Sequence, residues 1–149
     1  MIVLYIITGI ILIITSIQDI LDKDKVSSWM FAVIPVAMIA CALLTKSKID
    51  WIDCLIGATL GSIFFVFTYF GGCGGADAIM ALCIGFAYGS RDTAIFIVAS
   101  CLLFLIYLLV YSIVKKKKVK EIKSVSLPFI PAAAGGFLAM IILNHIIYS

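Results

Sequence analysis

TAIFIVASCLLFLIYLLVYSIV, the stretch from Thr93 to Val114, contains no charged residue. It is bounded by Arg91 and Asp92 on one side and by a run of lysines on the other. A helix needs roughly 20 mostly apolar residues to cross the hydrocarbon core of a bilayer. A membrane β-barrel instead shows alternating strands of about ten residues. The stretch therefore predicts a transmembrane helix and sets the fold class of the chain.

The composition excludes most soluble classes. Of 149 residues, 64% are hydrophobic and 13% are charged, whereas a soluble domain is about half apolar and about a quarter charged. The chain has too little polar surface to cover a water-soluble globule, so a disordered protein, a coiled coil and a secreted mini-protein are excluded. The lysine run from Lys115 to Lys123 lies between two apolar segments. It predicts a cytoplasmic loop rather than a nucleic-acid contact.

Five further apolar segments predict helices: Ile2–Gln18, Trp29–Thr45, Trp51–Phe70, Ala78–Gly89 and Leu127–Ile147. We expect a kink at Pro35, a tight turn at Arg91 and Asp92, and Pro128 in the first turn of the last helix. Residues 78–89 are few for a full span, which suits a helix that begins in a water-filled cavity. The sequence predicts an all-α fold, a polytopic six-transmembrane-helix bundle that forms a single domain over residues 1–149.

The basic residues predict the orientation in the membrane. With the N-terminus outside, the inside loops hold eight of them and the outside loops three: Lys23, Lys25, Lys115, Lys116, Lys117, Lys118, Lys120 and Lys123 against Lys46, Lys48 and Arg91. Cytoplasmic loops carry the excess of lysine and arginine. Both termini are therefore expected outside, in a multi-pass protein of the cell (cytoplasmic or inner) membrane surrounded by lipid.

Asp77 stands apart from the other acidic residues because it lies between the glycine cluster GGCGG (71–75) and an apolar helix. A carboxylate that borders the hydrocarbon is costly and indicates a functional site. The alternative is a helix N-cap, for which Asp is well suited. If six spans are counted, Asp19 at the end of the first helix and Asp77 at the start of the fourth lie on the same face of the membrane. This arrangement permits a carboxylate pair.

Two close carboxylates do not readily both ionise, so they share a proton. One can then activate a water as general base while the other donates a proton to a carbonyl oxygen. This is the chemistry of an aspartic protease, and it needs no metal and no organic cofactor. Asp22 and Asp24 compete with Asp19 but lie further into the polar loop. The five cysteines are odd in number and form no C-x-x-C pair, which argues against a zinc site or a disulfide framework.

The stretch GGCGGADAIMAL (71–82) resembles the GxGD segment of the type IV prepilin peptidase family, which includes the archaeal preflagellin peptidases. Asp77 matches the second catalytic aspartate of that family. DILDKDKVSSW (19–29) is similar to the segment of the first, with Asp19 at its position. SLPFIPAAAGGF (126–137) resembles the proline-containing entry to the family's last helix. Without the cysteine-rich segment of longer members, the chain looks like the short, peptidase-only form.

The resemblance implies an intramembrane aspartyl endopeptidase with Asp19 and Asp77 as catalytic residues. Its substrate would be a prepilin-like membrane precursor, cleaved between a short basic leader and an apolar helix at the cytoplasmic face. An active-site loop of Gly74, Gly75 and Ala76 would admit the substrate backbone, and Asp22 could contact the leader. A homo-oligomer is compatible with the sequence.

The chain departs from the family pattern at three places: Ala76 for Gly, Ile79 for Lys, and Val26-Ser27-Ser28 for Ile-Pro-Asn, one residue further from Asp19. Asp19 and Asp22 therefore both stay candidates for the first aspartate. Two other functions stay open: a small transporter or channel with a carboxylate cation site, and a catalytically silent homologue that acts in pilus assembly. A presenilin-like GxGD protease is a further alternative, although its first aspartate lies within a helix.

Overall fold

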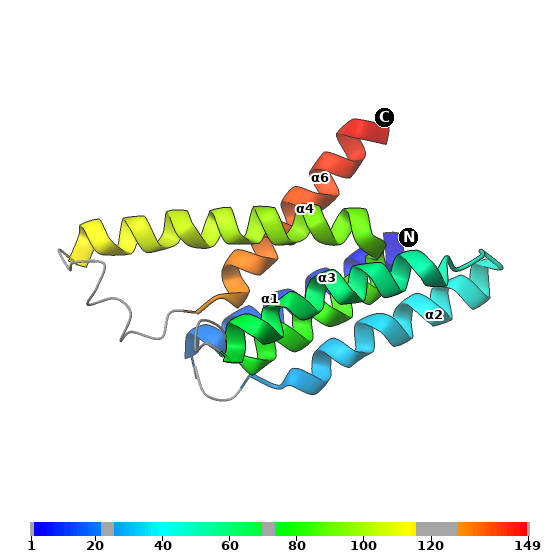
Figure 1. Cartoon of the computed structure of the whole chain (residues 1–149), viewed down its shortest axis with the longest axis horizontal. Coiled ribbons are helices and arrows are strands. Elements are labelled where there is room, and N and C mark those ends of the chain that lie inside the picture. Colours follow the sequence, from blue (N-terminus) through cyan, green and yellow to red (C-terminus); the bar gives the residue numbers. More distant parts are fainter. Residues whose placement is uncertain (1, 22–25, 70–73, 116–127, 149) are drawn as a thin grey trace.

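The computed structural model describes residues 2–21, 26–69, 74–115 and 128–148, and every element among them is a helix (Figure 1). In chain order they are α1 (Ile2–Leu21), the 3-10 helix η1 (Ser28–Ala32), α2 (Val33–Thr45), α3 (Trp51–Tyr69), α4 (Gly75–Lys115) and α6 (Ile130–Tyr148). The predicted all-α class is confirmed. By length and composition four of these segments could cross a membrane: Ile2–Leu21, Ser28–Thr45, Gly75–Val114 and Ile130–Ile147.

Helix α4 is broken at Gly89, which has φ 80° and ψ −178°. Only glycine adopts this backbone conformation readily, so two helical segments meet there at a sharp turn. The two segments were predicted, but the turn was expected at Arg91 and Asp92. That expectation is wrong, because the conformational freedom of Gly89 places the turn earlier. Arg91 and Asp92 instead lie in the first turn of the second segment.

Three helix boundaries differ from those predicted. Helix α1 continues to Leu21, so Asp19 lies within its last turn. Helix α4 begins at Gly75 rather than Ala78. Helix α6 begins at Ile130, so Pro128 precedes the helix and Pro131 is the proline of its first turn. A kink was expected at Pro35. Just before this proline, the chain changes from the 3-10 helix η1 to the α-helix α2 at Val33.

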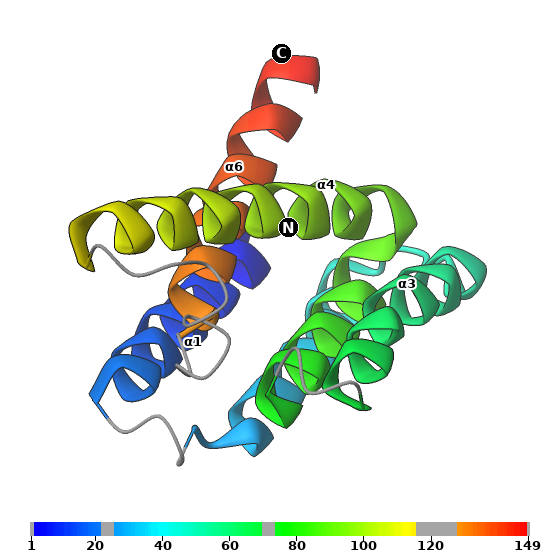
Figure 2. The ribbon, with the colours of Figure 1, turned by 60° about the vertical axis from the view of Figure 1, so that its left-hand side comes forward.

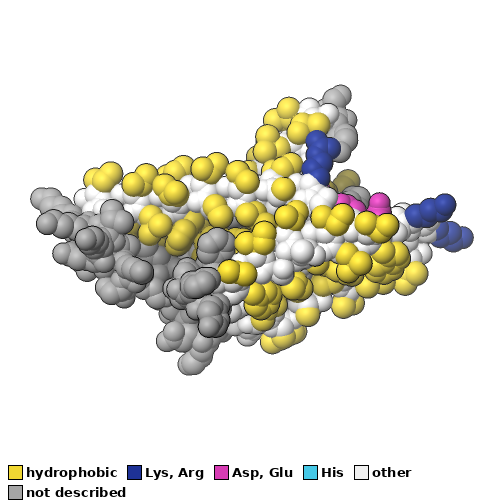
Figure 3. All heavy atoms as spheres, viewed as in Figure 1, with side chains coloured by type: hydrophobic (Ala, Val, Ile, Leu, Met, Phe, Trp, Pro, Cys, Tyr) yellow, Lys and Arg dark blue, Asp and Glu magenta, His cyan; other side chains and the backbone are white. Residues whose placement is uncertain are grey.

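The outer face of α1 is more apolar than its inner face. Ile6, Ile10, Ile13 and Ile17 are all more than half exposed, whereas Thr8, Thr15 and Asp19 are buried. Figure 3 shows hydrophobic side chains covering the visible surface, with the described lysine, arginine and acidic side chains gathered toward one end. An apolar exterior around a partly polar interior is what a bilayer, and not water, stabilises.

Close backbone contact joins α3 to the first segment of α4. A Cβ atom added to Gly57 or Gly85 would overlap the other helix, and one added to Gly61 would overlap the Ala81 carbonyl. Small residues four apart allow this approach between membrane helices. This spacing was not recognised from the sequence. Gly136 packs on Ser100 of α4, so that contact lies within the chain.

The helices form two groups joined by the second segment of α4 (Figure 2). Helix α1 and the beginning of α6 lie on one side, α3 with the first segment of α4 on the other, and the second segment crosses both. Successive segments run in alternating directions along the long axis of Figure 1. As a result the end of α1, the beginning of α4 and the beginning of α6 share one end of the molecule. The turn before α3 and the break at Gly89 share the other.

Candidate active site

Asp19 connects the end of α1 to the beginning of α6. Its side chain is buried, at 9% exposed. The backbone N–H of Ile130 donates a hydrogen bond to Asp19 Oδ2 at 3.1 Å, across 111 positions of sequence. Ile130 is the first residue of α6. Its N–H has no partner within the helix, as is general for the first turn, so the carboxylate of Asp19 serves as that partner.

Asp77 is the third residue of α4 and is 8% exposed. Its Oδ2 accepts a hydrogen bond from the backbone N–H of Gly74 at 2.9 Å. This is the second half of a capping box, in which the acidic residue at the third helical position reaches back to the residue before the helix. The N-cap alternative is therefore replaced by a related role. Asp77 does contribute to the helix end, but from inside the first turn.

An electrostatic interaction links the carboxyl groups of Asp19 and Asp77. The two residues are 58 positions apart in sequence and lie at the same end of the bundle (Figure 1), as the count of alternating segments predicted. Each carboxylate accepts a hydrogen bond from a backbone N–H at the N-terminus of a helix. That environment favours negative charge. A buried pair of this kind can hold one proton between its members and pass it to and from a bound water.

No family model, no curated protein and no solved structure matches this chain. The assignment of the site therefore depends on its own residues. Among the described residues no three His, Cys, Asp or Glu side chains gather in a way that could hold a metal ion.

The predicted active-site loop lies directly at Asp77. Gly74 and Gly75 are exposed and Ala76 is half-buried. A Cβ at Gly74 would lie 3.3 Å from Asp77 Oδ2 and would press on the carboxylate, whereas a Cβ at Gly75 would meet nothing within 4 Å. Asp22, the other predicted member of the site, lies outside the described residues.

An apolar groove of about 240 Å³ lies next to this end of the bundle. It runs between α3 and the second segment of α4, with Phe64, Phe104 and Phe129 among its lining residues. Phe129 immediately precedes Ile130, whose N–H binds Asp19. One residue that lines the groove, Phe129, is therefore next in sequence to the residue that binds Asp19.

A second polar region occupies the opposite end of the bundle and was missed by sequence reasoning. A cavity of about 350 Å³ there is lined by Asp50, Asp53 and Tyr88, among others. Asp53 accepts hydrogen bonds from the N–H (3.0 Å) and the hydroxyl of Ser90, at the beginning of the second segment of α4. The Tyr88 hydroxyl donates to Thr8 Oγ1 at 2.7 Å. Gly89 is the feature of the sequence that could have indicated this region, because a glycine there marks a helix end that needs a cap.

Proposed function

We propose that the chain is an intramembrane aspartyl endopeptidase that uses Asp19 and Asp77 as its catalytic pair. The observation that carries the proposal is the burial of two electrostatically interacting carboxyl groups, from distant helices, at one end of a bundle with an apolar exterior. Two buried like charges are costly to keep close. A general acid and a general base must be close, so the arrangement suits catalysis better than it suits packing.

The reaction is hydrolysis of one peptide bond. The ionised carboxyl takes a proton from a water, whose oxygen attacks the scissile carbonyl carbon, while the protonated carboxyl donates its proton to the carbonyl oxygen. The tetrahedral intermediate then collapses with cleavage of the C–N bond, and the amine leaves with a proton from the pair. The pair titrates as a unit, so the acid and base roles belong to both members.

The proposed substrate is a prepilin-like membrane precursor, cut between its basic leader and its apolar helix. Six membrane crossings with both termini outside would put Asp19, Asp77 and the lysine loop at the cytoplasmic face of the cell membrane. The alternating course of the helical segments in Figure 1 supports that count. The open space above Gly75 supports approach of an extended substrate backbone to Asp77.

The test is co-expression of the chain with several candidate precursors, each with a basic leader followed by an apolar helix, with leader removal followed by gel shift. The variants are Asp19→Asn, Asp22→Asn and Asp77→Asn. Asp53→Asn is the matched control, because Asp53 also accepts backbone N–H bonds at a helix N-terminus. Membrane accumulation of each variant is measured in the same samples.

We expect the wild type and Asp53→Asn to cleave, and Asp19→Asn and Asp77→Asn to be inactive although present in the membrane. Loss of cleavage in Asp22→Asn with activity retained in Asp19→Asn would move the first catalytic position by three residues. Cleavage by Asp77→Asn would overturn the proposal. If the wild type cleaves none of the precursors, the transporter and silent-homologue alternatives take its place.

A further inference from the structure

We infer that residues 128–131, which lead into the first turn of α6, are the positioning segment of the dyad: their backbone holds Asp19 at the correct place relative to Asp77. The inference rests on the proposed function for its catalytic consequence. It assigns to this segment a role that the sequence gives no sign of, because the group that acts is a backbone N–H. Three observations carry it.

The first observation is which backbone N–H groups near Ile130 can donate a hydrogen bond to Asp19. The Ile130 N–H is bound by Asp19 Oδ2 at 3.1 Å. Pro128 and Pro131 lie on either side of it and have no N–H, and the N–H of Ala133 is already bonded to the Phe129 carbonyl at 3.1 Å. The prolines also fix their own φ angles, so this turn presents the Ile130 donor from a stiff backbone.

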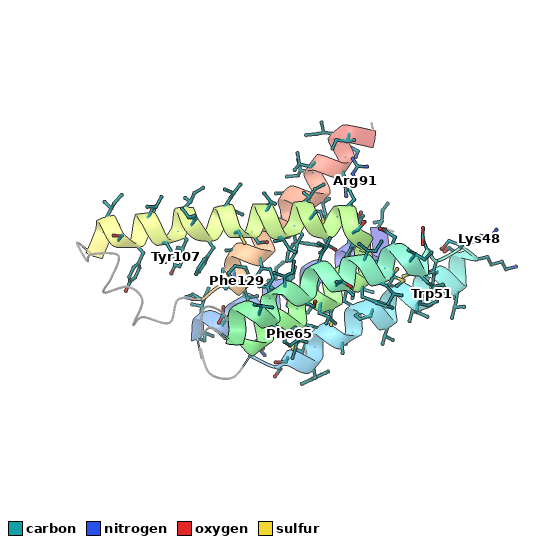
Figure 4. The ribbon with its side chains drawn as sticks, in the orientation of Figure 1. Lys48, Trp51, Phe65, Arg91, Tyr107 and Phe129 are labelled. Carbon is teal, nitrogen blue, oxygen red and sulfur yellow. The ribbon has the colours of Figure 1, made fainter. Side chains whose placement is uncertain are left out.

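The second observation is the anchoring of Phe129, which is 7% exposed. Its ring packs against Phe64 of α3 with centroids 5.6 Å apart, and edge-on against Phe104 of α4 at 5.2 Å. Figure 4 shows Phe129 at the beginning of α6, between α3 and the second segment of α4. The residue before Ile130 is thus packed against α3 and the second segment of α4.

The third observation is where α1 and α4 bond directly. Tyr88 of α4 donates to Thr8 near the beginning of α1, and its ring stacks on Tyr5 at 5.3 Å. These contacts lie at the end of the bundle away from the carboxyl pair. Near the pair, Asp19 is joined through Ile130 and Phe129 to Phe64 of α3. Helix α3 in turn packs closely against the first segment of α4, which carries Asp77. The separation of the two carboxyls therefore depends on α6.

The test removes the N–H of Ile130. Ile130→Pro lacks the N–H but suits the first helical position, and Ile130→Ala is the matched control that keeps the N–H while losing the side chain. Cleavage of a precursor is measured with purified protein in lipid vesicles. We expect kcat of Ile130→Pro to fall by about 10- to 100-fold relative to Ile130→Ala, with KM changed less than about twofold, because positioning acts on the transition state and not on substrate binding.

If Ile130→Pro does not accumulate, an amide-to-ester replacement at position 130 removes the same N–H. Its control is an ester at position 133, which removes the neighbouring bond to Phe129 and leaves Asp19 untouched. Equal kcat values for the 130 and 133 esters, or for the Pro and Ala variants, would overturn the inference.

A second measurement does not depend on cleavage. Spin labels are placed at Ile20 of α1 and Val66 of α3, which are 58% and 55% exposed, in a background without cysteine. We expect a broader distance distribution in Ile130→Pro than in Ile130→Ala. An unchanged width would refute the positioning role even if the wild type is a peptidase. Broadening in a chain that cleaves no precursor would leave the positioning role standing and remove the proposed function.

Discussion

The two ends of the bundle both use aspartates to complete helix N-termini, yet only one of them buries a pair. At the Gly89 end, Asp50 is exposed and accepts the N–H groups of Ile52 and Asp53 at 3.1 and 3.2 Å. Asp53 accepts from Ser90 across to the next helix. At the other end Asp19 and Asp77 are 9% and 8% exposed and interact electrostatically.

The comparison sets a carboxylate that only caps a helix against the pair that we propose to be catalytic. Capping a helix requires a single oxygen acceptor, and an exposed residue such as Asp50 supplies it without a desolvation cost. Capping does not require that two carboxylates be buried together. The buried pair therefore has a feature that helix stability does not explain, and the following predictions test that difference from the largest expected effect to the smallest.

Replacing either member of the pair by asparagine should stop cleavage. Asn keeps an oxygen that can accept the bond from Gly74 or Ile130, so the fold persists while proton transfer is lost. We expect a decrease in kcat of about 10²- to 10⁴-fold for Asp77→Asn and Asp19→Asn, and less than about twofold for Asp53→Asn. The measurement is single-turnover cleavage at equal amounts of membrane-inserted protein. A comparable loss in all three variants would remove the distinction between the two ends.

Gly89→Ala should destabilise the protein more than any substitution in the glycine loop. A Cβ at Gly89 would overlap the Asp53 carboxylate, and φ is 80°. We expect a loss of about 3 kcal/mol or more, from strain and overlap together. Gly75→Ala, which meets open space, is the control and should change stability by less than about 0.5 kcal/mol. Thermal unfolding in detergent distinguishes them; equal melting temperatures would contradict the assignment of the break.

Asp53→Ala should destabilise the fold without changing the chemistry. The substitution leaves the Ser90 N–H and hydroxyl without their acceptor, which costs about 1–2 kcal/mol for a helix cap. The kcat of the protein that remains folded should equal that of the wild type. Asp53→Asn, which keeps an acceptor, should recover most of the stability. If Asp53→Ala decreased kcat more than Ile130→Ala does, the Gly89 end would be assigned a catalytic role.

Asp50→Ala should have the smallest effect. Asp50 is exposed and caps its own helix, so its loss should cost about 0.5–1 kcal/mol, and Asp50→Ser should restore the cap. Melting temperatures of the three proteins measure this. A loss as large as that of Asp53→Ala would mean that Asp50 acts across helices as well.

The sequence predicted the all-helical class because hydropathy is a property of the chain alone. It also predicted that Asp19 and Asp77 lie at the same end of the bundle, since successive segments alternate in direction, and this position permits their pairing. It misplaced the turn after the fourth segment, because charged residues at Arg91 and Asp92 resemble a loop while the conformational freedom of Gly89 decides the turn. It placed Pro128 in the first turn of α6. The helix instead begins at Ile130, whose N–H finds its partner in Asp19.

The local features of this protein, namely its apolar helices, the glycines before Asp77 and the break in α4, follow from residue types and their spacing. The tertiary structure decided what surrounds the carboxylates. Asp19 is bonded to a backbone N–H 111 positions away, and Asp53 to a residue 37 positions away. Hydrogen bonds between distant segments depend on how helices pack, and packing depends on many small contacts at once. A pattern along the chain can therefore indicate that an aspartate matters, while only the packed bundle distinguishes a cap from a candidate catalyst.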